Sequence, residues 1–172
     1  MKAACALPFV LLAACTTLSE EECRAGYWYD IGLQDGEAGR TTDYLTKHTK
    51  ACAKFGITPN QSRWEDGRQD GLPLYCRPAR AWQEGAKGRQ LSPVCPAESL
   101  DRLERANWRG RTYHRIGRDI AEVEREIGSI NRALVSLPID DPSRASLIHQ
   151  RTLLRLEIVT LRAQRALYRY RY

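Results

Sequence analysis

An apolar stripe in the last third of the chain constrains the fold more than any other feature. Between residues 113 and 137, apolar residues recur at alternating spacings of three and four, the period of a coiled-coil helix. The positions are Tyr113, Ile116, Ile120, Val123, Ile127, Ile130, Leu134 and Leu137. Pro138 ends the pattern, which predicts one helix of about 39 residues, roughly 58 Å long at 1.5 Å per residue.

A second stripe follows after a short break. Asp141 suits the N-cap of a new helix and Pro142 suits its first turn. The stripe comprises Leu147, Leu154, Ile158, Leu161 and Tyr168, and it is interrupted at Arg151 and Arg165. Because a loop of about four residues makes consecutive helices antiparallel neighbours, residues 98–172 are predicted to form an antiparallel helical hairpin, a coiled coil.

The preceding part of the chain has a different composition, since nine of the twelve glycines fall between residues 15 and 99. Ser19 and Glu22 have the spacing of a capping box, and Thr58-Pro59-Asn60-Gln61 repeats it with proline at the first helical position. Gly56 is a candidate C-terminal cap. We expect short helices near residues 20–38, 43–55, 59–71 and 78–89. The predicted fold is all-α, a small disulfide-stapled bundle of short Gly-rich helices (residues 15–97) followed by the hairpin.

A weak internal repeat places glycines at helical spacing after Trp28, Trp64 and Trp82. Each glycine costs about 1 kcal/mol relative to alanine inside a helix, so repeated use predicts close packing against another backbone or an aromatic ring. An alternative is that each Asp-Gly marks a turn. The predicted packing glycines are Gly32, Gly36, Gly39, Gly67, Gly71, Gly85 and Gly88.

The chain begins with the pattern of an export signal: Lys2, an apolar run to Leu12, then Ala13-Ala14 before Cys15. The run is too short to span a bilayer, which needs roughly 20 apolar residues. Leu12 to Cys15 resembles a lipobox, and this resemblance implies a lipoprotein signal peptide over residues 1–14, with diacylglyceryl and palmitate chains on Cys15. The alternative is an ordinary secretory signal. Thr16 stands where an inner-membrane lipoprotein tends to carry Asp, which favours an outer-membrane protein facing the periplasm.

Four further cysteines, an even number, are expected to form two disulfides in an oxidising compartment. They lack the close C-x-x-C pairs typical of zinc sites, so no metal is expected. If the helices near 20–38 and 43–55 are antiparallel, Cys23 lies beside Cys52. Cys76 then pairs with Cys95 by elimination.

The charge of the chain is concentrated in its last part. Residues 100–172 hold 15 arginines against 9 acidic residues, whereas residues 15–99 are nearly balanced. Arginine suits phosphate and carboxylate partners, so anionic lipid headgroups, peptidoglycan or an acidic envelope protein are the expected partners, and nucleic acid is not. The candidate contacts are Arg162, Arg165, Arg169 and Arg171, within a tail that ends in alternating Tyr and Arg.

Evidence for catalysis is weak. His48 is the best candidate for a site, but no G-x-S-x-G, H-E-x-x-H or phosphate-binding glycine loop is present. The carboxylate pairs Asp35 with Glu37 and Asp66 with Asp70 fit a glycosidase or a calcium site less well than a solvated helix face. We therefore assign no catalytic residue and no cofactor.

Several ordered motifs resemble the bacterial lipoprotein family known as domain of unknown function 2799, over residues 18 to about 117. They are Leu18-Ser19-x2-Glu22-Cys23, Trp28-x3-Gly32-x2-Asp35-Gly36, His48-x3-Cys52, Gly67-x3-Gly71-x3-Tyr75-Cys76-x-Pro78, Gly85-x2-Gly88 and Val94-Cys95-Pro96. The resemblance implies an envelope lipoprotein with conserved cysteines and glycines, and it implies no activity.

Two hypotheses about function follow. The first is a noncatalytic envelope lipoprotein whose basic hairpin binds another envelope component, in an oligomeric state that the sequence leaves open. The second is a periplasmic enzyme acting on cell-wall material through His48 or the Asp-Gly acids. A pocket lined by acids with perturbed pKa values would favour the enzyme, and a flat Arg-rich hairpin would favour the binding protein.

Overall fold

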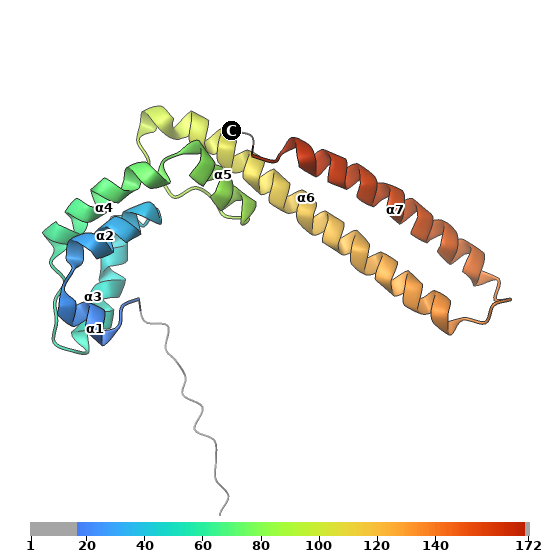
Figure 1. Ribbon diagram of the computed structural model, residues 1–172, viewed down its shortest axis with the longest axis horizontal. Helices are drawn as coiled ribbons and strands as arrows, with labels where there is room; N and C mark the ends of the chain where they lie inside the picture. Colours follow the sequence, from blue (N-terminus) through green and yellow to red (C-terminus); the bar gives the residue numbers. More distant parts are fainter. Residues whose placement is uncertain (1–16, 171–172) are drawn as a thin grey trace, which may run out of the picture.

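The computed structural model describes residues 17–170, and over this range the chain is all-helical, with no strand (Figure 1). The signal peptide, Cys15 and Arg171 lie outside the described residues. Seven α-helices and one short 3-10 helix make up this described part of the chain. They are α1 (Glu20–Ala25), α2 (Trp28–Glu37), η1 (Thr42–Tyr44), α3 (Leu45–Ala53), α4 (Gln61–Tyr75), α5 (Pro78–Ala86), α6 (Ala97–Ser136) and α7 (Ser143–Leu167). The predicted fold class is confirmed.

The helix predicted over residues 20–38 is in fact two helices. Gly26 adopts φ 65° and ends α1, and its N–H donates to the carbonyl of Glu22. A left-handed residue of this kind is a common helix terminator. The capping box at the start of α1 is confirmed, because the Ser19 N–H donates to Glu22 Oε2 at 2.7 Å and the Glu22 N–H donates to Ser19 Oγ at 3.2 Å.

The boundaries of α3 and α4 also refine the prediction. Gly56 takes φ 69° in the turn after α3, as expected of a cap. Asn60, not Thr58, caps α4, since its side chain accepts from the Arg63 N–H at 3.1 Å. The helix then continues past the predicted end and through Pro73 to Tyr75.

Both predicted disulfides are confirmed, Cys23–Cys52 and Cys76–Cys95. The first joins α1 to α3 and is fully buried in a core that includes Leu18, Trp28 and Trp64. The second joins the residue after α4 to the segment before α6, and it is only half-buried. The first disulfide therefore closes a loop that contains α2, and the second closes a loop that contains α5.

We call α2 and α4 the first helix pair. Their backbones touch at four glycines, so that a Cβ added to Gly32 would lie 1.9 Å from the Trp64 carbonyl oxygen. A Cβ on Gly36 would lie 2.2 Å from the Arg68 carbonyl oxygen, and Gly67 and Gly71 are equally crowded by α2. These four predicted packing glycines therefore allow two helix backbones to meet directly.

The second helix pair, α5 and α6, repeats this contact. A Cβ on Gly85 would lie 2.1 Å from the Asn107 carbonyl oxygen, and one on Gly110 would lie 2.1 Å from the Trp82 carbonyl oxygen. The sequence analysis missed Gly110 as a packing glycine. Gly39 and Gly88 pack against rings, those of Tyr75 and His114, as predicted, but they lie just after their helices, at φ 69° and 81°, and not within them.

The predicted hairpin consists of α6 and α7, which lie side by side in Figure 1. Ile116, Ile120, Val123, Ile130 and Leu134 of the first stripe are buried, together with Ile158 of the second. The first half of α6 belongs to the second helix pair, so this single helix joins the regions predicted at 15–97 and 98–172. Within residues 17–170 no helix is long and apolar enough to cross a membrane.

Candidate anion-binding site on helix α6

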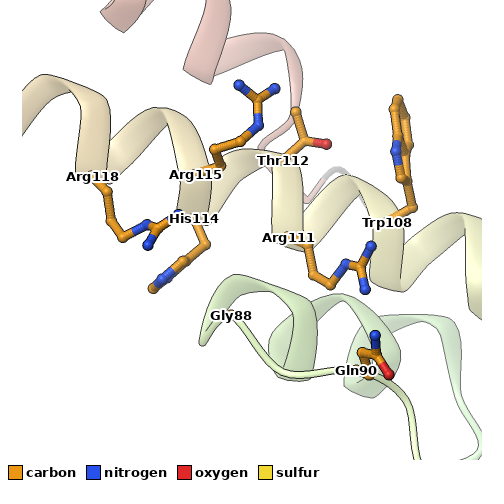
Figure 2. A pocket seen from close by; sticks show the side chains of 8 residues that line it. All are labelled: Gly88, Gln90, Trp108, Arg111, Thr112, His114, Arg115 and Arg118. Atoms are coloured by element: carbon orange, nitrogen blue, oxygen red, sulfur yellow. The ribbon is translucent and has the colours of Figure 1, made fainter.

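A hollow of about 450 Å³ lies between α6 and the segment that follows α5 (Figure 2). We call it the basic hollow, and its lining residues are Gly88, Gln90, Trp108, Arg111, Thr112, His114, Arg115 and Arg118. Most of them come from α6, where the three arginines are spaced four and three apart. This spacing places the three Cα atoms near one side of the helix, and the side chains diverge from there (Figure 2).

The walls of the basic hollow are held by hydrogen bonds from buried or half-buried groups. Asn107 donates to the carbonyls of Ala81 at 3.0 Å and Arg89 at 3.1 Å, which fixes the end of α5 on α6. The Nδ1 of His114 donates to the Ala86 carbonyl at 3.1 Å. Gly88 lets this imidazole approach, since a Cβ there would lie 2.9 Å from its Nε2. The site therefore has a preformed wall on two helices.

The ionisable residues that line the basic hollow are all basic. No carboxylate lines it, and in the described part of the chain the guanidinium groups of Arg111 and Arg118 make no hydrogen bond or ion pair. Arg115 has only a long contact to Asp119, 3.7 Å between Nη1 and Oδ2. Figure 2 shows Arg111, His114 and Arg118 pointing toward the segment of Gly88 and Gln90, while Arg115 points to the opposite side of α6.

This arrangement can bind an anion. A guanidinium presents a planar fork of N–H donors that matches a carboxylate or phosphate. The half-exposed Trp108 adds an apolar and aromatic surface at one end, and a second hollow of about 320 Å³ continues past it, lined in part by Gln90, Leu91 and Glu104. A flat or extended anionic ligand fits such a channel better than a small ion does.

The arginines singled out from the tail have other surroundings. Arg162 donates to Glu124 at 2.8 Å. Arg165 lies 4.0 Å from the centre of the Tyr113 ring and donates to the Tyr113 carbonyl at 3.3 Å. Arg169 is exposed, and Arg171 is outside the described range. The arginines of the basic hollow were missed, although their spacing of four and three on a predicted helix was a usable signal.

His48 lies in a separate, buried cluster of the first helix pair. Asp35 accepts from His48 Nε2 at 2.7 Å and from Trp64 Nε1 at 2.9 Å, and Thr17 Oγ1 lies 3.0 Å from His48 Nδ1. His48 is only 3% exposed. These bonds satisfy buried polar groups and connect the start of the described chain to α2, α3 and α4.

The residues Thr17, Asp35 and His48 of this cluster line a hollow of about 460 Å³, together with further acids, among them Glu21, Glu22 and Asp30. The backbone N–H of Ser19, together with its hydroxyl, lowers the pKa of Glu22. This perturbed pKa belongs to the helix cap of α1. A lowered pKa is the opposite of what a carboxyl group needs to act as a general acid at neutral pH.

The other carboxylate pairs do not form a joint site. Asp35 is buried whereas Glu37 is exposed, so the two do not face one space. Asp70 accepts from the Tyr29 hydroxyl at 2.7 Å, and Asp66 is exposed on the same helix. Among residues 17–170 no group of three or more His, Cys, Asp or Glu side chains has the arrangement to hold a metal ion.

The model of the family described as protein of unknown function, DUF2799, matches residues 27–112. The chain belongs to this family. In this DUF2799 protein the match covers the first helix pair, α5 and the first part of α6, and it ends within the basic hollow, so most of the hairpin follows it. No curated protein and no solved structure matches the chain.

Proposed function

We propose that this DUF2799 protein is a noncatalytic lipoprotein of the outer membrane, anchored by lipid at Cys15 and facing the periplasm, and that its basic hollow binds an anionic envelope component. The observation that carries the proposal is that Arg111 and Arg118 of α6 make no hydrogen bond or ion pair within residues 17–170 and line the same hollow. Three guanidinium groups and one imidazole line a single hollow without a carboxylate. The bound group is a phosphate or a carboxylate, as found on lipid headgroups and peptidoglycan.

The two disulfides support an envelope location. Disulfides persist in oxidising compartments such as the periplasm and are rare in the cytosol. The chain also needs them, because its first helix pair has glycines where other bundles have large apolar residues. A fold of this kind is therefore suited to an exported protein.

The position of Thr17 supports anchoring of the first helix pair close to the membrane. Thr17 follows Cys15 by two residues, and an extended chain covers at most about 3.6 Å per residue. Its hydroxyl contacts the buried His48. A lipid on Cys15 would thus hold the α1 and α3 end of the molecule at the bilayer, with the hairpin projecting away from it (Figure 1).

The binding experiment compares two triple variants of the same helix. Arg111→Gln, Arg115→Gln and Arg118→Gln together should weaken binding to phosphatidylglycerol vesicles or to purified peptidoglycan in a salt-dependent manner. The matched control replaces Arg105, Arg125 and Arg132 by Gln, which removes the same charge from exposed positions of α6 outside the hollow. Cosedimentation with each material measures binding.

Three outcomes separate the parts of this proposal. Loss of binding in the hollow variant alone supports a specific site, whereas equal loss in both variants would reduce it to nonspecific charge. Full binding by both variants would refute the site. The anchor is tested separately, because Cys15→Ser should abolish acyl labelling and release the protein from membranes, and unchanged processing would show an ordinary secretory signal instead.

A further inference from the structure

The basic hollow and the second hollow beside it differ in chemistry although they adjoin. Gln90, Trp108 and Arg111 line both, so hollows of about 450 Å³ and 320 Å³ form one channel. Figure 2 shows Trp108 and Gln90 on either side of Arg111. Volumes of this size are ordinary for small-molecule sites, which span roughly 300–1,000 Å³. A ligand long enough to occupy both hollows therefore meets two different sets of groups.

The basic hollow selects a negative charge. Arg111 and Arg118 make no hydrogen bond or ion pair within residues 17–170. A guanidinium group carries five N–H donors and no acceptor. The part of a ligand that lies here must therefore supply acceptor oxygens, and a phosphate or a carboxylate does so best.

The second hollow adds acceptors. Glu104 lines it, is exposed, and makes no hydrogen bond or ion pair in the described part of the chain. Asn107 also lines it, although this residue is only 5% exposed. The Nδ2 of Asn107 donates to the carbonyls of Ala81 and Arg89, which fixes the orientation of the amide. Its Oδ1 is left as an acceptor to which nothing in residues 17–170 donates.

These acceptors determine what the second hollow can hold. Glu104 would repel a second negative charge on the ligand. The carboxylate of Glu104 and the Oδ1 of Asn107 instead require O–H or N–H donors, because neither oxygen has a hydrogen of its own at neutral pH. The ligand therefore carries its charge at one end and hydroxyl or amide groups at the other.

Trp108 adds an aromatic surface that is common to both hollows. It is 53% exposed, although Tyr168 contacts it edge-on with ring centroids 5.8 Å apart. The face of an aromatic ring is negative, so it attracts the weakly positive C–H groups of a sugar ring. A saturated ring with polar groups on its rim fits such a surface better than a flexible chain does.

We infer that this channel binds an anionic sugar, an assignment that rests on the proposed function of the basic hollow. The phosphate or carboxylate lies at Arg111 and Arg118, and hydroxyl or acetamido groups of the ring donate to Glu104 and Asn107. Two envelope materials have this chemistry, the carboxylate-bearing sugar of peptidoglycan and the phosphate-bearing glucosamine of lipopolysaccharide. A glycerophospholipid headgroup supplies the anion and hydroxyl groups without the ring.

Titration calorimetry of the full chain, purified in detergent, compares each sugar with its own anion. N-acetylmuramic acid is paired with lactate, and N-acetylglucosamine 1-phosphate is paired with inorganic phosphate. At least one sugar should bind about tenfold more tightly than its anion, because it makes additional hydrogen bonds. The pair with the larger ratio identifies the source of the sugar. Glycerol 3-phosphate represents a phospholipid headgroup and should bind no more tightly than inorganic phosphate.

The outcomes separate this inference from the proposed function. Equal binding of the sugars and their anions, or equal binding of glycerol 3-phosphate and the better sugar, would overturn the inference and leave the anion site in place. Failure of every probe to bind would overturn both.

An acid of the second hollow provides the sharper measurement. Glu104→Ala should weaken the binding of the preferred sugar by about fivefold or more, because a hydrogen-bond acceptor is lost. The same variant should bind the matching anion equally or more tightly, because a nearby negative charge is removed. Tighter binding of the sugar by Glu104→Ala would overturn the inference, since Glu104 would then act only by repulsion.

Two further variants serve as controls. Asp101→Ala removes the same charge from an exposed position of α6 one turn earlier, outside both hollows, and should not weaken the binding of the sugar or of the anion. Arg118→Gln should weaken both, because the sugar and the anion share this contact. Because Asp101, Glu104 and Arg118 are exposed, all three variants should retain their helical circular dichroism. Loss of sugar binding in Asp101→Ala as large as in Glu104→Ala would refute the contact at Glu104.

Discussion

The two helix pairs share one backbone plan. Gly36 and Gly71 meet in the first pair as Gly85 and Gly110 meet in the second, at almost the same distances. A left-handed glycine, Gly39 or Gly88, follows the first helix of each pair by the same number of residues. Its N–H donates to the carbonyl of Gly36 at 2.9 Å or of Gly85 at 2.8 Å. A side chain on the second helix then donates to the carbonyl of the residue after this glycine. Arg68 donates to the Arg40 carbonyl in the first pair, and Asn107 donates to the Arg89 carbonyl in the second.

The side chains around this shared plan differ. Buried Asp35 of the first pair bonds to His48 and Trp64, whereas buried Glu84 of the second pair bonds to Arg89 at 2.6 Å and to Lys87. The ring against the left-handed glycine is Tyr75 in one pair and His114 in the other. Tyr75 accepts from the Ser92 N–H, whereas His114 lines the basic hollow. The comparison indicates that glycines determine the helix crossing and leave the surrounding residues free to acquire separate roles.

The largest expected difference in stability between the two regions comes from removing their disulfides. Replacing Cys23 and Cys52 by Ala should lower the free energy of unfolding by about 4 kcal/mol or more, because the lost cross-link is fully buried and also leaves a cavity. Replacing Cys76 and Cys95 should cost about 3 kcal/mol, since that bridge is half-buried. Urea denaturation measures both losses in the free energy of unfolding. Equal losses, or a larger loss for Cys76–Cys95, would show that burial does not determine how much each disulfide stabilises the fold.

Alanine at the crossing glycines should have the next largest effect. Gly36→Ala and Gly85→Ala each place a Cβ about 2 Å from a backbone oxygen, so the helices must separate, at an expected net cost of about 2–3 kcal/mol. Gly128→Ala is the control, because its Cβ would meet nothing closer than 3.6 Å. That variant should gain about 0.5–1 kcal/mol from helix propensity. Thermal unfolding measures the three variants. If Gly36→Ala or Gly85→Ala were as stable as Gly128→Ala, the shared backbone plan would be contradicted.

The smallest effect concerns the buried carboxylate of the second pair. Burial raises the pKa of Glu84, but hydrogen bonds and charges from Arg89 and Lys87 outweigh it and leave the pKa below its ordinary value. Such a group stabilises the fold above its unfolded pKa, and this stabilisation disappears as the pH falls through the folded pKa. Glu84→Gln should cost about 1–2 kcal/mol at neutral pH.

The pH dependence gives this prediction its control. Glu84→Gln should make stability less sensitive to acid below about pH 4.5, the region in which a free Glu titrates. The two proteins should converge in stability at low pH. A variant whose unfolding free energy falls with acid as steeply as that of the natural chain would show that Glu84 does not contribute this dependence.

The sequence by itself determined the helices and the disulfides. Heptad spacing predicted α6 and α7 because periodic apolar residues specify a helix and its buried side within a few turns. The cysteine pairing was predicted from an antiparallel order of the first two predicted helices, although Gly26 divides the first of them and α2 packs mainly on α4. The packing role of Gly32, Gly36, Gly67, Gly71 and Gly85 was visible because repeated glycine in a helix has an energetic cost.

Only the tertiary structure decided which partners these elements have. Gly110 lay in a segment expected to serve the hairpin alone, and its contact with Trp82 depends on the way that α5 folds back onto α6. The same holds for the arginines. Arg162 and Arg165 are engaged by Glu124 and Tyr113 from the neighbouring helix, while Arg111 and Arg118 remain open. Local spacing specifies the face of a helix on which a charge lies, but long-range packing determines what the charge meets.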